Sequence, residues 1–409
     1  MIKKNILVLS STFPHNENDT IPTFVKDQII GLKKEYSQLS FCVIAPTTHN
    51  IGIEKSEYFE QYRYRYFFKN FKAFEKYGLM PSIRRNFLTI FVIPFFIFFQ
   101  IFFTYKFIKK NKIDLIYAHW VTPQAITALV FKKFFNIPFI FTSHSQDANV
   151  LLKIPIFGRI LINSILRNCE NFSCVSKATY YILKNISTPN NWNEQKSLIY
   201  PMGIRDSLFE NTKEEKLSYS LKNNDKVFSF IGRFTEKKGV EKLIKDFSEL
   251  LKDNKNLFLT LNGSGELKNV YFSLIKSLGV ENNIHISKDF LNVNQLKHIY
   301  KNSDFIVIPS IKTNSGDTEG LPVVLLEALY FGNTTISSAE SNAGEIIKHG
   351  FNGFIYDTNE IDSFKNLVIK ILDNQFDLIK VKNNALIEGN KYKQKVASKI
   401  YFEHLFSNI

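Results

Sequence analysis

The sequence predicts an α/β protein built from two doubly wound domains. Strand-like apolar runs alternate with helical patterns through most of the 409 residues, this rhythm restarts once after a polar stretch, and 44% of the residues are hydrophobic. Such alternation is typical of right-handed βαβ units around a parallel sheet. A chain of this length and composition can bury full cores without disulfides or metals.

The first domain is expected over residues 1–202. Its strands are predicted, in chain order, at residues 6–10, 39–45, 115–118, 139–142, 172–175 and 198–200. Each run is short and apolar, and a helical pattern follows most of them. Pro201 and Gly203 together end the last run and mark the crossing to the next domain.

The second domain is expected over residues 203–385, and a polar, charged stretch at 211–226 precedes its first strand. Its strands are predicted at residues 228–231, 257–261, 284–286, 305–309 and 334–337. Residues 386–409 have a helical pattern, and this helix is expected to be able to pack back on the first domain.

The net charge of +14 predicts partners with negative charge. Basic residues gather among aromatic ones at residues 62–76 and 84–112, and no zinc-finger, RNA-recognition or heptad pattern accompanies them. We therefore expect an anionic membrane surface as a partner and no nucleic acid.

Residues 87–105 are almost entirely apolar, and basic residues flank them. By length the segment could span a bilayer, lie in the lipid interface or be an ordinary buried helix. A single span would put strands of one predicted sheet on opposite sides of the membrane. We therefore favour the interfacial helix, whose flanking cations are Arg84, Arg85, Lys106, Lys109 and Lys110.

The three cysteines, Cys42, Cys169 and Cys174, have no metal-type spacing, and their odd number makes a poor disulfide framework. The apolar run at residues 6–9 is too short for the core of a signal peptide. We expect a cytoplasmic protein, peripheral at the inner face of the plasma membrane.

The most informative segment runs from Glu319 to Glu327. Pro322 suits the first position of a helix, and Gly320 allows a ligand close to the backbone. The free N–H groups at such a helix start, including that of Leu321, favour a phosphate. The two carboxylates would then address different parts of one ligand. The alternative is a capped surface helix with two solvated glutamates.

A second group of candidates follows the first strand of the second half. Arg233 and Lys238 lie beside Gly232, where two fixed cations could hold a diphosphate as its charge grows on departure. The alternative is a solvated basic pair on a surface turn. Gly263 and Gly265 form a further turn, interpreted as lining the same site.

Several chemistries lack their motifs. The turn at Gly263 misses the third glycine of a dinucleotide fingerprint, and neither a Walker-type loop nor a serine nucleophile elbow is present. The absence of an Asp-x-Asp pair argues against a metal-bridged diphosphate. We expect no cofactor and no metal.

In the first half, His144 comes directly after a strand, where an imidazole can bond a hydroxyl or polarise a leaving oxygen. A satisfied structural histidine is the alternative. His119 ends the preceding strand, and Phe13 lies in a loop expected at the same edge. Phe13, His119 and Asp147 are assigned to the acceptor side, and His144 is assigned to catalysis.

Taken together, these motifs make the chain resemble the retaining, metal-independent glycosyltransferases of family four. The resemblance covers the spaced glutamates, Gly232-Arg233 with Lys238-Gly239, the Thr-x-His motif at His144, the Gly-x-Gly-Glu turn, and Gly344-Glu345 with Gly350 and Gly353. It implies the GT-B architecture, in which two Rossmann-like domains face a central cleft. The longer stretches 114–120 and 316–322 look most like members that build exopolysaccharide, capsule or O-antigen.

The resemblance also implies roles for single residues. Arg233 and Lys238 would hold the diphosphate, and Glu327 would bond the ribose hydroxyls. Glu319 would hold the donor sugar with the backbone of Gly320 and Leu321, and His144 would contact that sugar near the reaction centre. The implied partners are a UDP- or GDP-sugar donor and a lipid-linked or glycan acceptor.

Two departures from the family pattern concern the acceptor side and the hinge. The loop at residues 22–24 lacks the usual glycine, and Met202-Gly203-Ile204-Arg205 replaces the common Asn-Gly-Ile/Val-Asp. A non-catalytic, membrane-associated scaffold of the same fold, a nucleotide-sugar epimerase and a phosphorylase remain as alternative functions.

Overall fold

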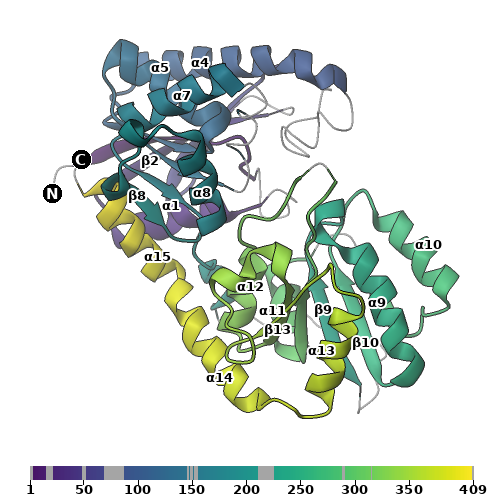
Figure 1. Cartoon of the computed structure of the whole chain (residues 1–409). Coiled ribbons are helices and arrows are strands. Elements are labelled where there is room, and N and C mark those ends of the chain that lie inside the picture. The colour runs from purple at the N-terminus through teal and green to yellow at the C-terminus, as the bar shows by residue number, and fades with distance from the viewer. Residues whose placement is uncertain are drawn as a thin grey trace. The chain divides into compact units, whose positions relative to one another are not determined.

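A computed structural model of the chain describes residues 3–14, 22–47, 52–68, 87–144, 147, 151, 155–210, 225–287, 291–314 and 316–407. They form two compact units, shown in Figure 1: Met1–Gly203 with Gln394–Ile409, and Ile204–Lys393. Each unit is built on one sheet of mostly parallel strands with helices on both faces. The predicted class, α/β with two Rossmann-like domains, is confirmed.

The sheet of the first unit has the order β3-β4-β2-β1-β5-β6-β7-β8. All neighbours pair parallel except β3 with β4. The strands are β1 (Lys4–Leu9), β2 (Leu39–Pro46), β3 (Ile53–Lys55), β4 (Phe59–Tyr64), β5 (Leu115–His119), β6 (Phe139–Ser143), β7 (Phe172–Cys174) and β8 (Ser197–Ile199). Sequence reasoning missed β3 and β4 because their polar residues hide the apolar pattern.

Helices cover both faces of this sheet, and β1 shows how its side chains alternate between them. Ile6 and Val8 pack in the core that includes α1 (Phe24–Glu35) and α15 (Gln394–Tyr401). Leu7 and Leu9 pack in the core on the other face. The helices of that face include α4 (Ile93–Lys110), α5 (Ile126–Phe135), α7 (Pro155–Asn168) and α8 (Lys177–Ile186).

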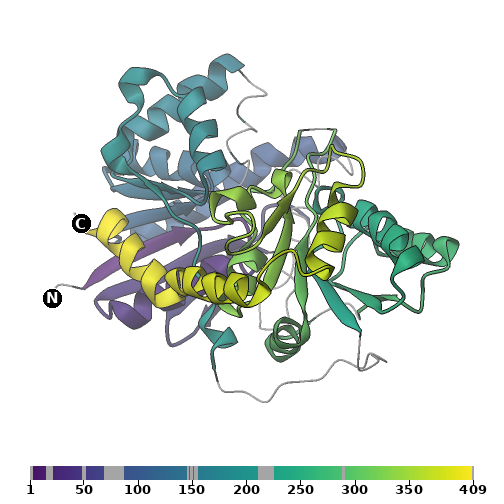
Figure 2. The same ribbon diagram turned by 60° about the horizontal axis from the view of Figure 1, so that its bottom comes forward.

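The C-terminal helix α15 belongs to the first unit and packs against α1, as Figure 2 shows in yellow and purple. The Tyr401 hydroxyl donates a hydrogen bond to the Tyr200 carbonyl at 2.8 Å. At Gly31 there is no room for a side chain, since a Cβ would lie 2.5 Å from Cγ of Gln394. The chain therefore returns to the first unit at residue 394, whereas residue 386 was expected.

The helix before that return, α14 (Leu378–Gly389), stays with the second unit because it packs on α12 (Val323–Tyr330). A Cβ at Gly389 would collide with the backbone of Tyr330. This close packing keeps α14 in the second unit. The expected division between residues 385 and 386 was therefore wrong, because it falls inside this helix.

The sheet of the second unit has the order β11-β10-β9-β12-β13-β14, and its described pairs are all parallel. Its strands are β9 (Lys226–Ile231), β10 (Leu257–Asn262), β11 (Ile284–Ile286), β12 (Phe305–Ile308), β13 (Thr334–Ser338) and β14 (Phe354–Tyr356). Its other helices are α9 (Val240–Asp253), α10 (Lys268–Leu278), α11 (Val293–Asn302) and α13 (Ser363–Leu372). Apolar side chains of α9, α10 and α13 form a core on one face, and those of α11 and α12 contribute to a core on the other.

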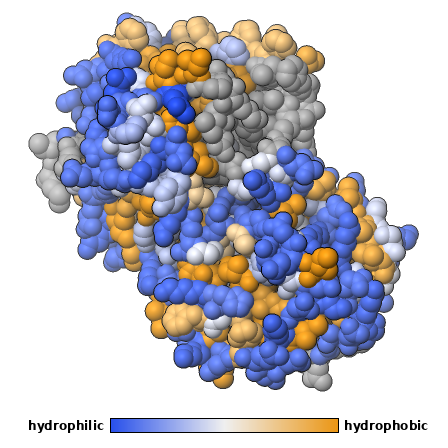
Figure 3. All heavy atoms as spheres, in the orientation of Figure 1, coloured by the Kyte–Doolittle hydropathy of each residue, from blue (hydrophilic) through white to orange (hydrophobic). Residues whose placement is uncertain are grey.

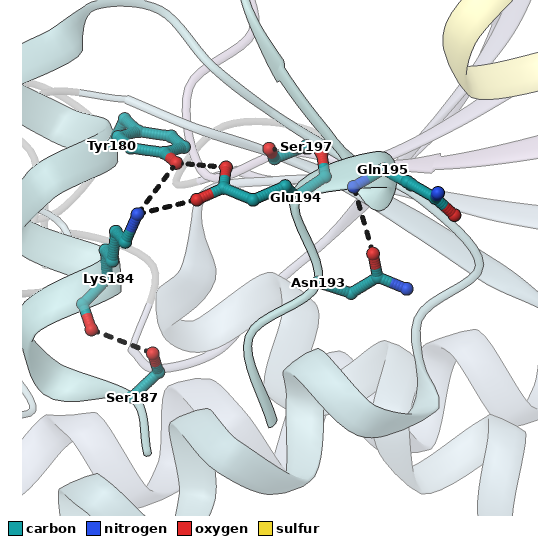
Figure 4. A network of polar contacts seen from close by, with 7 residues as sticks. All are labelled: Tyr180, Lys184, Ser187, Asn193, Glu194, Gln195 and Ser197. Atoms are coloured by element: carbon teal, nitrogen blue, oxygen red, sulfur yellow. Dashed lines mark hydrogen bonds and ion pairs between the residues drawn. The ribbon is translucent and has the colours of Figure 1, made fainter. Parts of the chain in front are cut away.

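A polar clasp in the first unit joins α8 to the segment before β8 (Figure 4). Lys184 Nζ lies 2.6 Å from a carboxylate oxygen of Glu194, and the Tyr180 hydroxyl donates to the other oxygen. Lys184 and Tyr180, in that order, lower the pKa of Glu194 to about 2. These bonds attach the segment that leads into the edge strand β8 to helix α8.

Residues 87–105 form the short helix η1 (Phe87–Val92) and most of α4. One face of α4 is buried through Phe96, Gln100, Thr104 and Phe107. No helix within the described ranges combines the length and apolarity that crossing a membrane needs. Part of the predicted basic region, residues 69–86 with Arg84 and Arg85, lies outside the described residues.

Candidate functional site

The direction of winding reverses in the second unit between β9 and β12. Strand β9 has β10 on one side and β12 on the other, so the connections from this point leave in opposite directions. Open α/β sheets bind ligands at the carboxyl ends of the strands at such a switch point. The loops after β9 and β12 carry most of the residues predicted for the donor side.

Glycines allow the loops after β9 and β10 to touch through their backbones. The N–H of Gly232 donates to the Asn262 carbonyl at 3.0 Å, and that of Phe234 donates to the Ser264 carbonyl at 2.8 Å. A Cβ at Gly263 would collide with the Gly232 carbonyl, and one at Gly265 would lie 2.5 Å from that of Phe234. In this structure the glycines predicted for donor binding shape the loops.

An ion cluster joins the loop after β9 to the loop after β12. Nζ of Lys238 lies 3.3 Å from Oε1 of Glu319, and Nζ of Lys237 lies 3.7 Å from the same oxygen. Lys237 also lies 3.8 Å from a carboxylate oxygen of Asp317. Its carbonyl accepts a hydrogen bond from the Ile311 N–H at 2.9 Å, which ties the two loops together.

Sequence reasoning missed Lys237 and Asp317, although both lie next to predicted residues. Lys237 precedes Lys238 in the 3-10 turn η6 (Glu236–Lys238), and this adjacency was the available signal. Only the fold shows that both lysines reach the same carboxylate.

The charges of the cluster hold one another ionised. Burial alone would raise the pKa of Glu319, whose side chain is 11% exposed, but Lys238, Lys237 and Arg233 lower it to about 2. Burial lowers the pKa of Lys238, and Glu319 opposes that effect. Arg233 is itself exposed, but its charge is close enough to act on both groups.

The loop after β12 leads into α12, which begins at Val323. Pro322 has ψ of 125° and therefore precedes the helix, one position earlier than predicted. Asn342 donates from its amide to the carbonyls of Glu319 at 2.7 Å and Gly320 at 3.0 Å, and so fixes the loop. Among the described residues, none accepts a hydrogen bond from the N–H of Gly320, Leu321 or Val323.

Glu327 lies on α12 and is buried, with both carboxylate oxygens bonded inside the unit. The Tyr300 hydroxyl donates to Oε2 at 2.6 Å, and Nε of Arg205 donates to Oε1 at 3.1 Å. Arg205 stands where the family pattern commonly has an acidic residue. Sequence reasoning noted this departure, but the separation of 122 positions gave no signal that Arg205 pairs with Glu327.

The first unit has its own switch point beside β1, which lies between β2 and β5. His119 ends β5, and His144 directly follows β6. Nδ1 of His119 lies 3.1 Å from Nε2 of His144, and the rings stack with centroids 5.4 Å apart. Trp120 and Phe24 also lie against His144, with centroids 4.8 and 5.1 Å away.

Both imidazoles are neutral near pH 7. Burial lowers the pKa of His144 to about 3. Burial, and then the neighbouring His144, lower the pKa of His119 well below its usual value. The pair can therefore bond oxygen atoms without carrying charge.

Asp147 and Phe13 support this edge from within the protein. Asp147 accepts hydrogen bonds from the Val121 N–H at 2.6 Å and the Ser143 hydroxyl at 2.7 Å, so it ties the loop after β5 to that after β6. Phe13 is buried with its ring edge against Phe59, 5.3 Å between centroids. The side chain of Phe13 thus lies in the core below the edge.

The backbone beside His119 is strained. Trp120 has φ of 81°, a left-handed conformation that costs a bulky residue about 1–3 kcal/mol. Its N–H donates to the Thr142 carbonyl at 2.8 Å, and this bond holds the turn. Such strain is concentrated at functional sites.

The predicted residues therefore form two groups, one in each unit. Arg233, Lys238 and Glu319 come together in the second unit, and His144, His119 and Asp147 come together in the first. Across the part of the chain that the structure describes, no group of three or more His, Cys, Asp or Glu side chains could hold a metal ion. Metal independence stays a prediction.

A cationic cluster at the switch point of a doubly wound sheet, beside helix-start amides that have no acceptor among the described residues, is typical of α/β proteins that bind phosphate groups. Family comparisons narrow this class. The family described as "Glycosyl transferases group 1" matches residues 211–391, and "Glycosyltransferase Family 4" matches residues 61–191. The chain belongs to the GT-B glycosyltransferases of family four.

Three relatives illustrate the similarity. The chain is 28% identical to an uncharacterized glycosyltransferase of Methanocaldococcus jannaschii, covering 66% of this chain and 68% of the relative. It is 24% identical, over 71% and 75%, to UDP-Gal:alpha-D-GlcNAc-diphosphoundecaprenol alpha-1,3-galactosyltransferase of Escherichia coli. It is 27% identical, over 66% of this chain and 68% of the relative, to GalNAc-alpha-(1->4)-GalNAc-alpha-(1->3)-diNAcBac-PP-undecaprenol alpha-1,4-N-acetyl-D-galactosaminyltransferase of Campylobacter jejuni.

Solved structures agree on the fold. Sucrose-phosphate synthase from Thermosynechococcus elongatus matches with a TM-score of 0.73 at 15% identity, over 100% of both chains. HepE from Anabaena, in complex with UDP and glucose, matches with a TM-score of 0.65 at 14% identity, over 99% of this chain and 100% of that one. The family assignment favours glycosyl transfer over the scaffold, epimerase and phosphorylase alternatives.

Proposed function

We propose that this glycosyltransferase moves a sugar from a UDP- or GDP-sugar to a lipid-linked or polysaccharide acceptor, with retention of configuration and without a metal ion. The UDP and glucose of the Anabaena structure support the donor type. The undecaprenol-linked substrates named for the E. coli and Campylobacter relatives support the acceptor type. The observation that carries the proposal is the ion cluster around Glu319 at the switch point of the second unit.

The cluster has the charge that a departing diphosphate requires. Arg233, Lys237 and Lys238 contribute three positive charges against the two carboxylates Asp317 and Glu319, which leaves one positive charge. A phosphate oxygen about 4 Å from one of these cations would gain roughly 4 kcal/mol per pair of unit charges in a partly screened site. The amides at the start of α12, for which the described residues hold no acceptor, add to this attraction.

In the proposed reaction, the bond between the sugar C1 and the diphosphate oxygen breaks while the acceptor oxygen bonds to C1 from the same face. The proton of the acceptor hydroxyl passes to the departing phosphate. Glu319 needs no nucleophilic role, because as a carboxylate it can accept hydrogen bonds from hydroxyls of the donor sugar. His144 contacts the same sugar near C1.

Glu327 is proposed to bond the ribose hydroxyls. Tyr300 and Arg205 each donate to one of its oxygens. A carboxylate oxygen has about two acceptor positions, so each oxygen keeps capacity for a further donor. The internal bonds would therefore orient Glu327 for the ribose.

The test is transfer by the purified protein from a panel of UDP- and GDP-sugars to an undecaprenyl-diphosphate-linked sugar. NMR coupling constants of the product give its anomeric configuration, and an α-linked product is expected from an α-linked donor. A β-linked product would refute retention. EDTA should leave the rate unchanged, and a loss that Mg²⁺ reverses would refute metal independence.

We also propose that the enzyme lies peripherally at the cytoplasmic face of the membrane, and one surface of the first unit supports this location. Exposed phenylalanine rings follow one another at helical spacing along η1 and α4. Figure 3, in the orientation of Figure 1, shows apolar atoms where Figure 1 labels α4. We call these residues, Phe91, Phe95, Phe98 and Phe102, the phenylalanine stripe. The exposed cations Lys106, Lys109 and Lys110 follow it at the end of α4, as in helices that lie in an anionic interface.

Replacing Phe95 and Phe98 together by serine should reduce co-sedimentation with vesicles that contain anionic phospholipid. The matched control replaces two exposed isoleucines of α14 in the second unit, Ile379 and Ile387, in the same way. Equal loss in both double variants, or no loss in the first, would contradict the assignment of the phenylalanine stripe to the membrane.

A further inference from the structure

The contact between the two histidines of the first unit limits where their protons can be. His119 is fully buried, whereas 7% of His144 is exposed, so His119 lies behind His144. A neutral imidazole has one N–H donor and one acceptor nitrogen. Across the 3.1 Å contact, either Nδ1 of His119 donates to Nε2 of His144 or the reverse holds.

The other nitrogen of His119 decides between these two arrangements. Nε2 of His119 is buried and has no partner among the described residues. If His144 donated, this atom would be a buried N–H without an acceptor. If His119 donates, the same atom is a buried acceptor without a donor. Proteins leave buried acceptors unpaired more readily than buried N–H donors, so the second arrangement is favoured.

We propose that His119 is a positioning residue for His144. Its Nδ1–H donates to Nε2 of His144 and thereby fixes the single proton of His144 on Nδ1. Nδ1 of His144 has no hydrogen-bond partner among the described residues, so its N–H is available to an oxygen atom of the donor sugar. This inference rests on the proposed glycosyl transfer.

The surrounding contacts keep the two rings in this relation. Asp147 holds the loop after β5 through the Val121 N–H, and it also accepts from the His144 N–H at 3.4 Å. The ring of Tyr117 lies 4.3 Å from that of His119, and the ring of Trp120 lies 4.8 Å from that of His144, centroid to centroid. Burial also keeps both rings neutral, which the one-proton arrangement requires.

Two variants of similar polarity test the proposal. In His119→Asn, the side-chain amide can place an N–H close to the position of Nδ1, so the bond to His144 is retained. In His119→Gln, the longer side chain places its amide near the position of Nε2, and the bond is lost. We expect His119→Gln to lower kcat roughly 10- to 100-fold, as loss of a group that orients a ligand-binding histidine does, and His119→Asn to restore most of it.

The proton itself is read by two-bond ¹⁵N–¹H correlation spectra of the full chain with ¹⁵N-labelled histidine, with His144→Phe to assign the signals. The expected wild-type spectrum has His144 protonated on Nδ1 and unprotonated on Nε2. A proton on Nε2 of His144, or equal kcat in the Asn and Gln variants, would overturn the inference. Wild-type protein without any transfer activity would instead refute the proposed function, since the spectrum reports the tautomer independently of turnover.

Discussion

The two units place their candidate sites at equivalent positions but build them from opposite chemistry. Each site lies at the carboxyl ends of strands beside the switch point of a parallel sheet. In the second unit, lysines surround an ionised carboxylate. In the first, two neutral imidazoles lie among aromatic rings.

This difference shows that the fold sets where a ligand can bind. The burial and the charged neighbours of each site residue set whether that residue carries a charge. Lys238 is 15% exposed, and burial lowers its pKa, but the carboxylate of Glu319 opposes that effect and favours the charged form. His144 has no such partner among the described residues, and burial lowers its pKa so that the ring is neutral near pH 7. The second unit therefore suits an anion, and the first suits uncharged hydroxyl and ether oxygens.

The largest expected effect comes from removing a cation from the charged site. Lys238→Ala should lower kcat about 10²–10³-fold, because it removes a group that stabilises the charge of the departing diphosphate. Steady-state kinetics with the preferred donor measures this loss. Lys245→Ala is the control, since Lys245 pairs with Glu241 on the exposed side of α9 and should leave kcat unchanged. A fully active Lys238→Ala enzyme would refute the diphosphate role.

A smaller effect, on stability, is expected from removing a hydrogen bond to the buried carboxylate of Glu327. Tyr300→Phe removes the hydrogen bond to Glu327 and should lower the free energy of unfolding of the second unit by about 1.5–3 kcal/mol. Urea unfolding followed with and without UDP measures this change. Tyr330→Phe is the matched control, because the Tyr330 hydroxyl has no hydrogen-bond partner among the described residues, so its loss should change stability by about 0.5 kcal/mol or less.

The smallest expected effect is the dependence of the stability of the first unit on pH, which tests whether His144 is neutral in the folded protein. His144 has a pKa of about 3 when folded and about 6.5 when unfolded, so between these values the unfolded state binds more protons. Acidification below pH 6.5 therefore destabilises the first unit by up to about 1.4 kcal/mol per pH unit from this residue. Unfolding in urea from pH 7 to pH 5 measures the slope, and His144→Asn should reduce it. An unchanged slope would mean that His144 is charged in the folded state.

Particular residues show how far sequence reasoning reached. The placement of Lys238 and Glu319 at the ligand edge of one sheet was predictable, because glycines, cations and a helix start recur at the ends of predicted strands, but their ion pair was not. The exposed and buried faces of α4 could not be separated by composition, since nearly all of its residues are apolar. The helix was predicted to begin at Pro322 but begins one residue later, at Val323, because helix ends depend on backbone angles that the sequence only biases.

The sequence by itself determined the two doubly wound sheets, their order along the chain and the edges at which functional residues lie. It could do so because hydrophobic periodicity and turn residues act over short distances. Only the tertiary structure decided that Arg205 and Tyr300 hold Glu327, that Lys237 shares Glu319, and that His119 lies behind His144. These relations join residues far apart in the chain, and packing alone brings them within bonding distance.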